Sequence, residues 1–484
     1  MRRADGSQWA AGAALFAAAG LAGAAACDFD AKILGCSGLT GDELARCEAY
    51  NAGTMGGGAG GAGGAAGAVG AAGAGGSTMG AGGAGGGGGL VCTLPEVACG
   101  AACRNVQADA DNCGICGRRC LGAALCVQGA CVPEALATNE VAPYALADDG
   151  SYLYWVSPAV KANDAAFRSR VRRVAKAGGG AVESLFGSTE VRARSLAFAG
   201  GKLFWGDLGT GPADSNQNLF SGTPGSALPD NPPVAAGQLN VQHVAVAGGK
   251  VYWTVANDAA VRGKASNGTG VVSPNVLGQS SVGWLAVDGE ARPYWLAGVP
   301  REVRRLVTAP STAEAVASGT NVVAVELAGG RYYWADRAVG TVQSRPKATP
   351  TEVPRAEFGG RGTVEGFAVV VAGGAGGAAG AGGAGGIGGA AGAGGAAGEA
   401  ALYVLTSQGG QLKAWRKGPD DDAPLLLGQV TAKADPFYPA GPPFGATHVV
   451  VDDKYVYFAD VGTVDTAQVV PTSQGDGVVY RVAK

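Results

Sequence analysis

The stretch VQHVAVAGGKVYWT, residues 241–254, contains a short apolar strand, a glycine turn and a second strand that ends in an aromatic pair. Apolar residues that alternate in this way predict half-buried strands, and a two-residue Gly-Gly connection predicts a β-hairpin. Near-copies of the phrase are ARSLAFAGGKLFWGD at 193–207, VVAVELAGGRYYWAD at 322–336 and ATHVVVDDKYVYFAD at 446–460. Four copies of one hairpin indicate an internal repeat.

The repeat has seven units between about residue 134 and residue 484, two of them looser and one degenerate. The consecutive aromatic positions are 50, 48, 42, 39, 70 and 54 residues apart, and they are Trp155, Trp205, Trp253, Trp295, Trp334, Val404 and Phe458. A period of about 40 to 50 residues with several short strands per unit is typical of a β-propeller. The sequence therefore predicts an all-β fold, a seven-bladed β-propeller over residues 133–484, with six or eight blades as alternatives.

The aromatic position is expected to fill the space between neighbouring blades, because bulky rings contribute most to buried packing. The alternative, an aromatic stripe that binds a ligand, is less favoured. An aspartate follows the aromatic pair in three units, at Asp207, Asp336 and Asp460. The phrase resembles the YWTD blades of lipoprotein-receptor propellers over nearly all of residues 134–484. This resemblance implies that the aspartates tie neighbouring blades together through backbone hydrogen bonds.

The two ends of the propeller region are expected to share one blade. The chain ends on GVVYRVAK, residues 477–484, which matches the third strand of a unit and leaves the last unit without a fourth strand. The segment that begins at Glu134 aligns instead with a fourth strand that begins at Glu314. A strand at Glu134–Ala137 would complete the seventh blade and remove the exposed sheet edges, which predicts a closed ring.

Residues 90–132 form a separate module that is rich in cysteine. Its eight cysteines are Cys92, Cys99, Cys103, Cys113, Cys116, Cys120, Cys126 and Cys131. An even number of cysteines in a short segment with little aliphatic bulk predicts a disulfide-stapled fold, whose connectivity does not follow from the sequence. The alternative is zinc, suggested by the CxxC at Cys113 and Cys116, but the module has no histidine and eight thiolates would need two metals.

The phrase DNCGICGRRCLGAALCVQGACV, residues 111–132, resembles the small cysteine-rich repeat of plant stigma-specific proteins. The resemblance covers only this module. It implies an extracellular unit without catalytic activity.

Residues 1–26 have the pattern of an export signal. Arg2 and Arg3 are followed by a weakly apolar stretch, and small residues precede Cys27. The segment resembles a bacterial lipoprotein signal, which implies acylation of Cys27; the alternative is a secreted chain. Cys36 and Cys47 can pair within a short segment at 27–51, which leaves Cys27 as the odd cysteine. We therefore expect an exported protein, held at the outer membrane or cell surface, or secreted.

Two tracts consist almost only of glycine and alanine. The chain has 87 glycines, and many lie at 52–89 and at 372–398. Segments with almost no side chains to bury cannot offset the entropy of ordering. We expect a disordered tether at 52–89, between the export signal and the cysteine module. The tract at 372–398 is expected to be a disordered insertion in the hairpin of the sixth unit.

The net charge of −3 gives no basic surface for nucleic acid. No internal stretch has the roughly 20 strongly apolar residues of a membrane span, so membrane contact is expected only through a lipid on Cys27.

The chain has two histidines, His243 and His448, and both begin the first strand of their units, at equivalent positions. In a propeller this position lies near the central channel, and metal ligation is one interpretation. The other units have no third histidine there, so a structural role is favoured. Neither GxSxG nor HExxH is present. We therefore expect no catalytic residue, no metal and no cofactor.

Long connections between units are the better indication of function, because loops on a rigid scaffold commonly carry recognition. They are Ser157–Ser169, Leu208–Asn218, Ala434–Gly445 and Val461–Gly477, all on the expected channel face. The sequence favours a binding protein for an unknown protein, peptide or polysaccharide. The alternatives are a propeller enzyme, a lyase or lactonase-type hydrolase with a channel metal, and a structural component of an extracellular matrix.

Overall fold

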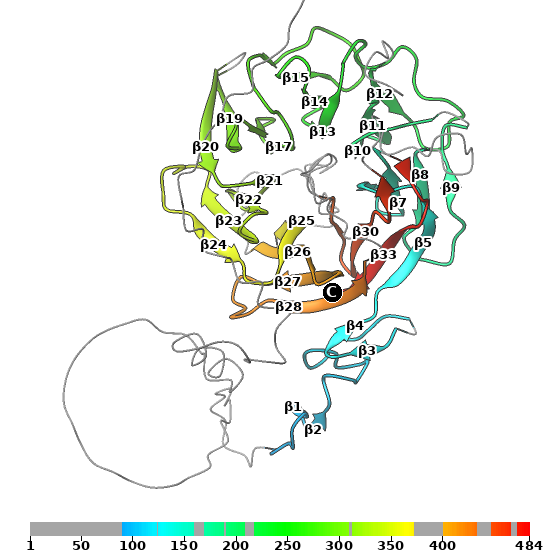
Figure 1. The fold of residues 1–484 in the computed structure, drawn as a ribbon, viewed down its shortest axis with the longest axis vertical. Coiled ribbons are helices and arrows are strands. Elements are labelled where there is room, and N and C mark those ends of the chain that lie inside the picture. The colour runs from blue at the N-terminus through cyan, green and yellow to red at the C-terminus, as the bar shows by residue number, and fades with distance from the viewer. Residues whose placement is uncertain are drawn as a thin grey trace, which may run out of the picture. The chain divides into compact units, whose positions relative to one another are not determined.

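The structure, a computed structural model, describes residues 90–122, 124–158, 169–187, 190–208, 217–308, 312–371, 400–432, 447–465 and 472–484. Within these ranges every regular element is a β-strand, and no helix is long and apolar enough to cross a membrane. Seven antiparallel sheets surround a common axis as a seven-bladed β-propeller (Figure 1). The fold predicted from the hairpin repeat is therefore confirmed.

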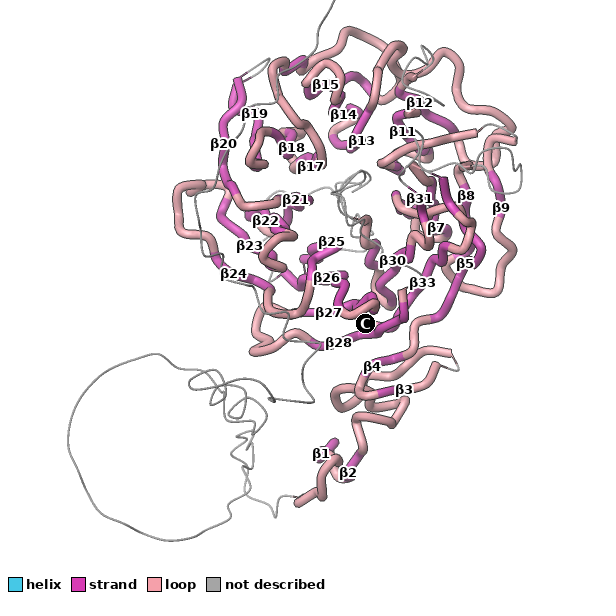
Figure 2. The backbone as a smooth tube through the Cα atoms, viewed as in Figure 1, coloured by secondary structure: helices cyan, strands magenta, loops and turns pink. Residues whose placement is uncertain are grey.

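The first strand of each blade lies nearest the axis and the last lies at the rim (Figures 1 and 2). Blade 1 has β6 (Ala145–Asp148), β7 (Tyr152–Val156), β8 (Arg172–Ala175) and β9 (Glu183–Ser184). Blade 2 has β10 (Leu196–Ala199), β11 (Lys202–Gly206) and β12 (Leu219–Gly222), and Ala235 bridges Leu219 beyond β12. Blade 3 has β13 (Val241–Ala247), β14 (Lys250–Val255), β15 (Ala260–Ala265) and β16 (Asn275–Val276).

The next three blades repeat the same antiparallel order. Blade 4 has β17 (Leu285–Val287), β18 (Pro293–Ala297), β19 (Glu302–Thr308) and β20 (Thr312–Ser318). Blade 5 has β21 (Val322–Ala328), β22 (Arg331–Asp336), β23 (Thr341–Pro346) and β24 (Arg355–Phe358). Blade 6 has β25 (Thr363–Val371), β26 (Ala400–Gln408), β27 (Gln411–Lys417) and β28 (Leu425–Thr431).

Blade 7 joins the two ends of the propeller. It consists of β29 (Val450–Val451), β30 (Tyr455–Asp460), β33 (Gly477–Ala483) and, from the other end of the region, β5 (Glu134–Glu140). A small hairpin, β31 (Val464–Asp465) with β32 (Thr472–Ser473), lies between β30 and β33. Ring closure by the segment at Glu134 is confirmed, although β5 extends three residues beyond the predicted end.

The glycines of the repeat form the hairpin turns. Gly248 and Gly249 have φ values of 57° and 72°, and the turns in blades 2 and 5 have the same signs. Two successive positive φ values define the type I′ turn that suits the twist of a hairpin, and glycine adopts them without a steric penalty. In blades 1 and 7 an aspartate caps the turn instead: Asp452 accepts hydrogen bonds from the Lys454 and Tyr455 amides.

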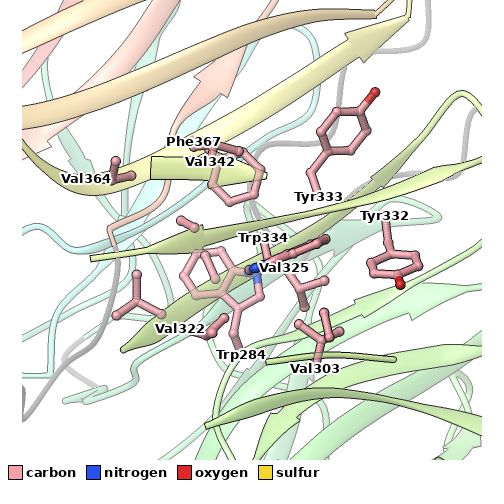
Figure 3. Close-up of a cluster of buried hydrophobic side chains, with 14 of the residues drawn as sticks. Trp284, Val303, Val322, Val325, Tyr332, Tyr333, Trp334, Val342, Val364 and Phe367 are labelled. Carbon is pink, nitrogen blue, oxygen red and sulfur yellow. The ribbon is translucent and has the colours of Figure 1, made fainter. Parts of the chain in front are cut away.

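The tryptophans of the repeat lie in the packing between blades. Trp155, Trp205, Trp253, Trp295 and Trp334 are each at most 1% exposed, and Phe458 is fully buried. Figure 3 shows Trp334 among Val303 of blade 4, Val325 of blade 5 and Phe367 of blade 6. One ring therefore belongs to a core cluster that spans three blades.

Three of these indoles share a second feature. Each donates a hydrogen bond to a side chain 15 or 16 residues earlier, which lies at the end of β5 for Trp155 and in the loop from the preceding blade for the other two. An arginine from the third strand of the same blade contacts the same acceptor. The groups are Trp155–Glu140–Arg172, Trp253–Gln238–Arg262 and Trp295–Gln279–Arg304. Polar bonds therefore reinforce three of the blade boundaries.

The cysteine module packs against the rim. Its strands are β1 (Val97–Cys99), β2 (Ala102–Arg104), β3 (Cys126–Val127) and β4 (Ala130–Cys131). The eight cysteines form four disulfides, which are Cys92–Cys103, Cys99–Cys116, Cys113–Cys126 and Cys120–Cys131. Cys113, Cys120 and Cys131 share one core cluster with Leu427 and Val482 of blades 6 and 7. The module and the propeller are therefore packed together as one unit.

Arg118 connects the module to two blades. Its guanidinium donates to the carbonyls of Leu426 (3.0 Å) and Leu427 in β28, and to that of Ala483 (3.3 Å) in β33. The residue is only 5% exposed, and burial together with Arg416 lowers its pKa to about 10. The side chain therefore stays charged at neutral pH and joins the last two blades to the module.

We expect Arg118→Met to lower the free energy of unfolding by about 3 kcal/mol, because three carbonyls lose a charged donor. Urea unfolding of the disulfide-intact protein measures this. The control is Arg119→Met, since Arg119 pairs with Asp111 at an exposed site and such pairs contribute little. Equal stabilities of the two variants would contradict the assigned role of Arg118.

A buried ion cluster lies at the boundary where the ring closes. Lys176 of blade 1 lies 3.5 Å from the carboxylate of Asp148 and 2.8 Å from that of Asp452 in blade 7. Burial raises the pKa of Asp148, whereas Lys176, Tyr457 and backbone amides outweigh burial and lower the pKa of Asp452. One cation therefore compensates a buried and a partly buried carboxylate across the closing boundary.

We expect Lys176→Met to lower the free energy of unfolding at pH 7 by about 3 to 5 kcal/mol, because both carboxylates lose their cation. The deficit should shrink as the pH falls towards about 4, because in the variant the carboxylates have lost Lys176 and take up protons more readily. The lowered pKa of Asp452 means that its own contribution is present above its unfolded pKa and is lost on acidification.

Urea unfolding at both pH values measures the effect. The control is Lys202→Met, whose partner Asp230 is also 28 residues away, at 2.8 Å, but whose ion pair is partly exposed. Loss of the Lys202–Asp230 ion pair should lower the free energy of unfolding by at most about 1 kcal/mol. A deficit for Lys176→Met that is independent of pH would exclude the charge explanation.

Candidate functional site

Three aromatic side chains from different blades meet at the propeller axis. The ring centroids of His243 and Trp284 are 4.5 Å apart, those of Trp284 and His448 are 4.9 Å apart, and those of the two histidines are 5.5 Å apart. These residues, called the axial cluster below, come from blades 3, 4 and 7. Because blades 3 and 7 are not neighbours in the ring, their contact spans the axis.

Strand register explains why these residues meet. In blade 3 Val244 pairs with Trp253, and in blade 4 Leu285 pairs with Trp295. In blade 7 Val450 pairs with Tyr457, which puts Val449, the residue after His448, opposite Phe458. This register gives the three residues of the axial cluster equivalent positions. The other four blades have small side chains there, which are Ala145, Ser195, Ala324 and Gly366. The sequence placed both histidines near the channel, but it did not predict their contact with each other or with Trp284.

The strand position shared by the axial cluster also joins neighbouring blades. His448 Nδ1 lies 3.2 Å from the Leu146 nitrogen and 3.1 Å from the Leu146 oxygen in the neighbouring blade. Ser195 makes the equivalent pair of contacts with Val244, at 3.0 and 3.3 Å. Polar side chains at this position therefore bind the backbone of the next blade.

These contacts use His448 Nδ1, but several other buried nitrogens of the axial cluster have no partner. Within the described ranges no hydrogen bond of good geometry reaches His448 Nε2, either ring nitrogen of His243, or Trp284 Nε1. The three side chains are 0%, 3% and 6% exposed. Buried polar atoms of native proteins nearly always have a partner, so four such atoms in one cluster require an explanation.

Both imidazoles are neutral at pH 7. Burial lowers the pKa of His448 to about 4, against a smaller opposing effect of the Leu146 backbone. Burial and then His448 lower the pKa of His243 well below its ordinary value, and the Leu285 backbone opposes this. Each ring therefore has one N–H donor and one acceptor nitrogen.

Two arginines lie next to the axial cluster. An Arg194 N–H donates to the side-chain oxygen of Gln242, the residue before His243. A Cβ atom at Gly283, the residue before Trp284, would lie 3.6 Å from Arg301 Nη1. Both guanidinium groups, called the arginine pair below, therefore contact the segments that carry two members of the cluster.

Burial is the main cause of a lowered pKa for both members of the arginine pair. Tyr144 opposes the shift in each case, and Arg192 and Arg301 lower the pKa of Arg194 further. The ring centroid of Tyr144 lies 6.2 Å from that of His448. The cluster is therefore bordered by positive charge and a phenol group.

A third arginine, Arg337, forms an ion pair with a carboxylate of the protein itself. Arg337 follows β22 in blade 5 and lies 3.0 Å from Glu365 in blade 6, whose side chain is 1% exposed. Glu365 occupies the β-bulge at the start of β25, between Val364 and Gly366. The sequence did not single out either residue, because a bulge depends on pairing with the neighbouring strand.

The aspartates of the repeat lie at the ends of second strands. Asp336 accepts hydrogen bonds from the Thr320 amide (2.7 Å) and the Asn321 amide (3.2 Å), in the loop that enters its blade. Asp460 accepts from the Gly462 amide at 3.0 Å, and Asp207 donates its own amide to Asn218. The side chains of Asp336 and Asp460 thus contact backbone amides of adjoining loops, and a tie between neighbouring blades stays a prediction.

Several predicted features lie outside the described residues. They are the export signal, Cys27, Cys36, Cys47, both glycine and alanine tracts, and much of the four long connections. In the described part of the chain, the one group of three or more potential metal ligands is Cys113, Cys120 and Cys131, and these cysteines are in disulfides. Neither histidine belongs to such a group.

Comparison with known proteins concerns the two parts separately. The family model described as the stigma-specific STIG1-like protein family matches residues 84–135. These residues contain a STIG1-like cysteine-rich module. The match does not extend to the propeller, and no curated protein matches the chain.

Solved structures with a similar propeller are only distantly related. A chain of the nidogen–laminin complex is 16% identical, covers 44% of this chain and 78% of its own length, and has a TM-score of 0.34. A streptogramin B lyase is 11% identical over 73% of this chain and 97% of its own, with a TM-score of 0.44. A catalytically inactive virginiamycin B lyase from Staphylococcus aureus with quinupristin is 10% identical, with coverages of 72% and 98% and a TM-score of 0.44. At these identities and TM-scores the similarity assigns neither a role nor a partner to this chain.

The buried histidines predict a specific pH dependence of stability. The pKa of His448 is about 4 in the fold and about 6.5 in an unfolded chain, so the unfolded state takes up the proton first as the pH falls. His448 therefore does not lower the free energy of unfolding above about pH 6.5, and it lowers it by up to about 3 kcal/mol towards pH 4.

His448→Gln removes this proton uptake, so we expect a flatter decline in the free energy of unfolding between about pH 6.5 and 4.5 than in the unmodified protein. Urea unfolding across this range makes the comparison, and carboxylate effects common to both proteins cancel. An NMR titration in which His448 has a pKa near 6.5 would contradict the prediction.

Proposed function

We propose that this chain is an exported binding protein, whose propeller binds its ligand over the axial cluster and the arginine pair. The supporting observation is the set of unpartnered nitrogens of His243, Trp284 and His448 beside partly buried arginines. Leaving a buried polar group without a hydrogen bond costs about 1 to 3 kcal/mol. A ligand that supplies the missing partners would recover that free energy, which is typical of a binding site.

Export is supported by the STIG1-like module. Four disulfides within about 40 residues are stable in an oxidising compartment, and such modules are common in extracellular proteins. The proposal includes cleavage of the signal at 1–26 and a flexible tether at 52–89. A lipid on Cys27 would hold the protein at the outer membrane or cell surface; otherwise it is secreted. The proposed ligand is a protein, peptide or polysaccharide of the same compartment.

The alternative of an enzyme with a channel metal is less favoured. The charged groups beside the axial cluster, Arg194 and Arg301, are cations that would repel a metal ion. The two histidines supply at most two ligands, and no carboxylate of the described residues completes a group with them. Neutral imidazoles next to guanidinium groups are better suited to binding an uncharged or anionic ligand.

The test measures the melting temperature of the purified protein against a panel of soluble saccharides and peptides. A ligand at about 100 times its dissociation constant adds about 2.7 kcal/mol and shifts the transition by several degrees. Trp284→Phe, which removes the indole N–H but keeps an aromatic ring, should weaken each hit about ten-fold. The matched control is Trp415→Phe, whose indole N–H is bonded to Thr406 inside blade 6.

A panel without any hit, or hits that Trp284→Phe and Arg301→Gln leave unchanged, would refute the proposed site. A shift with a divalent cation alone that His243→Gln abolishes would favour the enzyme alternative instead.

A further inference from the structure

We infer that the axial cluster binds a hydroxyl group of an uncharged saccharide. This inference rests on the proposed function and specifies the chemical class of the ligand at the same site. It depends on which hydrogen-bonding atoms of His243, Trp284 and His448 remain once the contacts within the protein are made.

The strand position that carries these rings directs one polar atom to the backbone of the next blade. The Ser195 hydroxyl makes this contact with Val244. His448 makes it through Nδ1, with Leu146. A serine hydroxyl has no further polar atom, whereas an imidazole has a second nitrogen. In His448 this is Nε2, which is buried and without a partner in the described part of the chain.

His243 has the same relation to blade 4. The Leu285 backbone raises the pKa of His243, so it lies beside the imidazole, but neither ring nitrogen has a partner at good hydrogen-bond geometry among the described residues. Trp284 Nε1 is the third group in this state. Because the three ring centroids lie 4.5 to 5.5 Å apart, these nitrogens form one compact group.

The axial cluster contains both donors and acceptors. Trp284 Nε1 only donates, and the neutral imidazole of His243 has one donor and one acceptor nitrogen. His448 Nδ1 lies 3.2 Å from the Leu146 nitrogen and 3.1 Å from the Leu146 oxygen. When the amide donates to Nδ1, Nε2 carries the ring proton and donates; when Nδ1 donates to the carbonyl, Nε2 accepts. A group that satisfies the cluster must therefore donate and accept.

Ionic groups do not meet this requirement. A carboxylate only accepts, so the acceptor nitrogen of His243 would stay without a donor. An ammonium group only donates, so the Trp284 N–H would stay without an acceptor. In a trans peptide the N–H and C=O point in opposite directions, whereas the three rings lie together. A hydroxyl has its donor and its acceptor sites on one oxygen atom.

Burial and the surrounding side chains favour a saccharide as the source of this hydroxyl. His448, His243 and Trp284 are 0%, 3% and 6% exposed, so only a small group can reach them. Polar side chains adjoin the cluster: Gln242 precedes His243, and the Tyr144 ring centroid lies 6.2 Å from that of His448. A saccharide can insert one hydroxyl and present further hydroxyls to such a polar border, whereas a serine or threonine side chain has only one.

The experiment measures the binding of D-glucose, D-galactose and D-mannose to the full purified protein by calorimetry, with the uronate and the amino sugar of each hexose as charged twins. We expect at least one neutral hexose to bind, about ten-fold or more tightly than its charged twins. Among the monodeoxy forms of that hexose, the one that lacks the inserted hydroxyl should bind at least about ten-fold more weakly, because the buried nitrogens are then left unpaired.

Two variants and one spectroscopic signal test the assignment to the cluster. His243→Phe and Trp284→Phe keep an aromatic ring but remove nitrogens, and each should weaken hexose binding about ten-fold. Trp415→Phe is the control, because its indole N–H is bonded to Thr406, and it should not change binding. In NMR spectra the indole N–H resonance of Trp284 should shift on binding and that of Trp415 should not. A cooperative melting transition checks that each variant is folded.

The outcomes separate this inference from the proposed function. Binding of a serine-containing peptide that depends on Trp284, without binding of any hexose, would overturn the saccharide and leave the binding site in place. Tighter binding of a uronate or an amino sugar than of its neutral hexose would overturn the uncharged class. Hexose binding that neither His243→Phe nor Trp284→Phe changes would show that the hydroxyl is held elsewhere. Absence of any hexose, peptide or charged-sugar binding would refute the inference together with the proposed site, and a buried water would then be the partner of these nitrogens.

Discussion

Closure of the ring is the constraint on which the rest of the structure depends. β5, from the start of the propeller region, must pair with β33 at its end, because otherwise blade 7 would lack its outer strand and both strands would have unpaired edges. Buried cations lie near this boundary, with Lys176 between two carboxylates on one side and Arg118 across the last two blades on the other. Closure also brings the first strands of seven blades to one axis, and the axial cluster exists only because of it.

The blades use two kinds of contact with different sequence signatures. Apolar packing by the tryptophans follows the local repeat, and Trp334 in its three-blade cluster is an example (Figure 3). The polar contacts join three of the indoles to an earlier acceptor, such as Gln238 or Gln279, and an arginine of the third strand contacts the same acceptor. Their spacing of 15 or 16 residues from the tryptophan is regular. A search for polar residues at a fixed distance before each tryptophan would have found them.

The structural features that lie within the repeat could be predicted from the sequence. Hairpins with Gly-Gly turns, the seven units and the closing strand at Glu134 all follow from local patterns, and they are present. The position of both histidines near the axis follows too, because equivalent residues of a propeller lie at equivalent radii. Contacts between blades that are not neighbours depend on the diameter of the closed ring, so the meeting of His243 with His448 could not be predicted. Arg301 lies in a loop outside the repeat, and its relation to Gly283 depends on the turn that carries it.

Departures from the repeat are therefore the best guide to function in this fold. Seven equivalent positions face the axis, and there is no room for seven large side chains, so four blades have small residues while blades 3, 4 and 7 carry rings. Packing alone would be satisfied by apolar rings at these three positions. Histidine and tryptophan instead bring nitrogens that the described residues leave unpartnered. Arg337, by contrast, pairs with Glu365 of the next blade. Where a buried polar group has no partner among the described residues, the missing partner is best sought in a ligand.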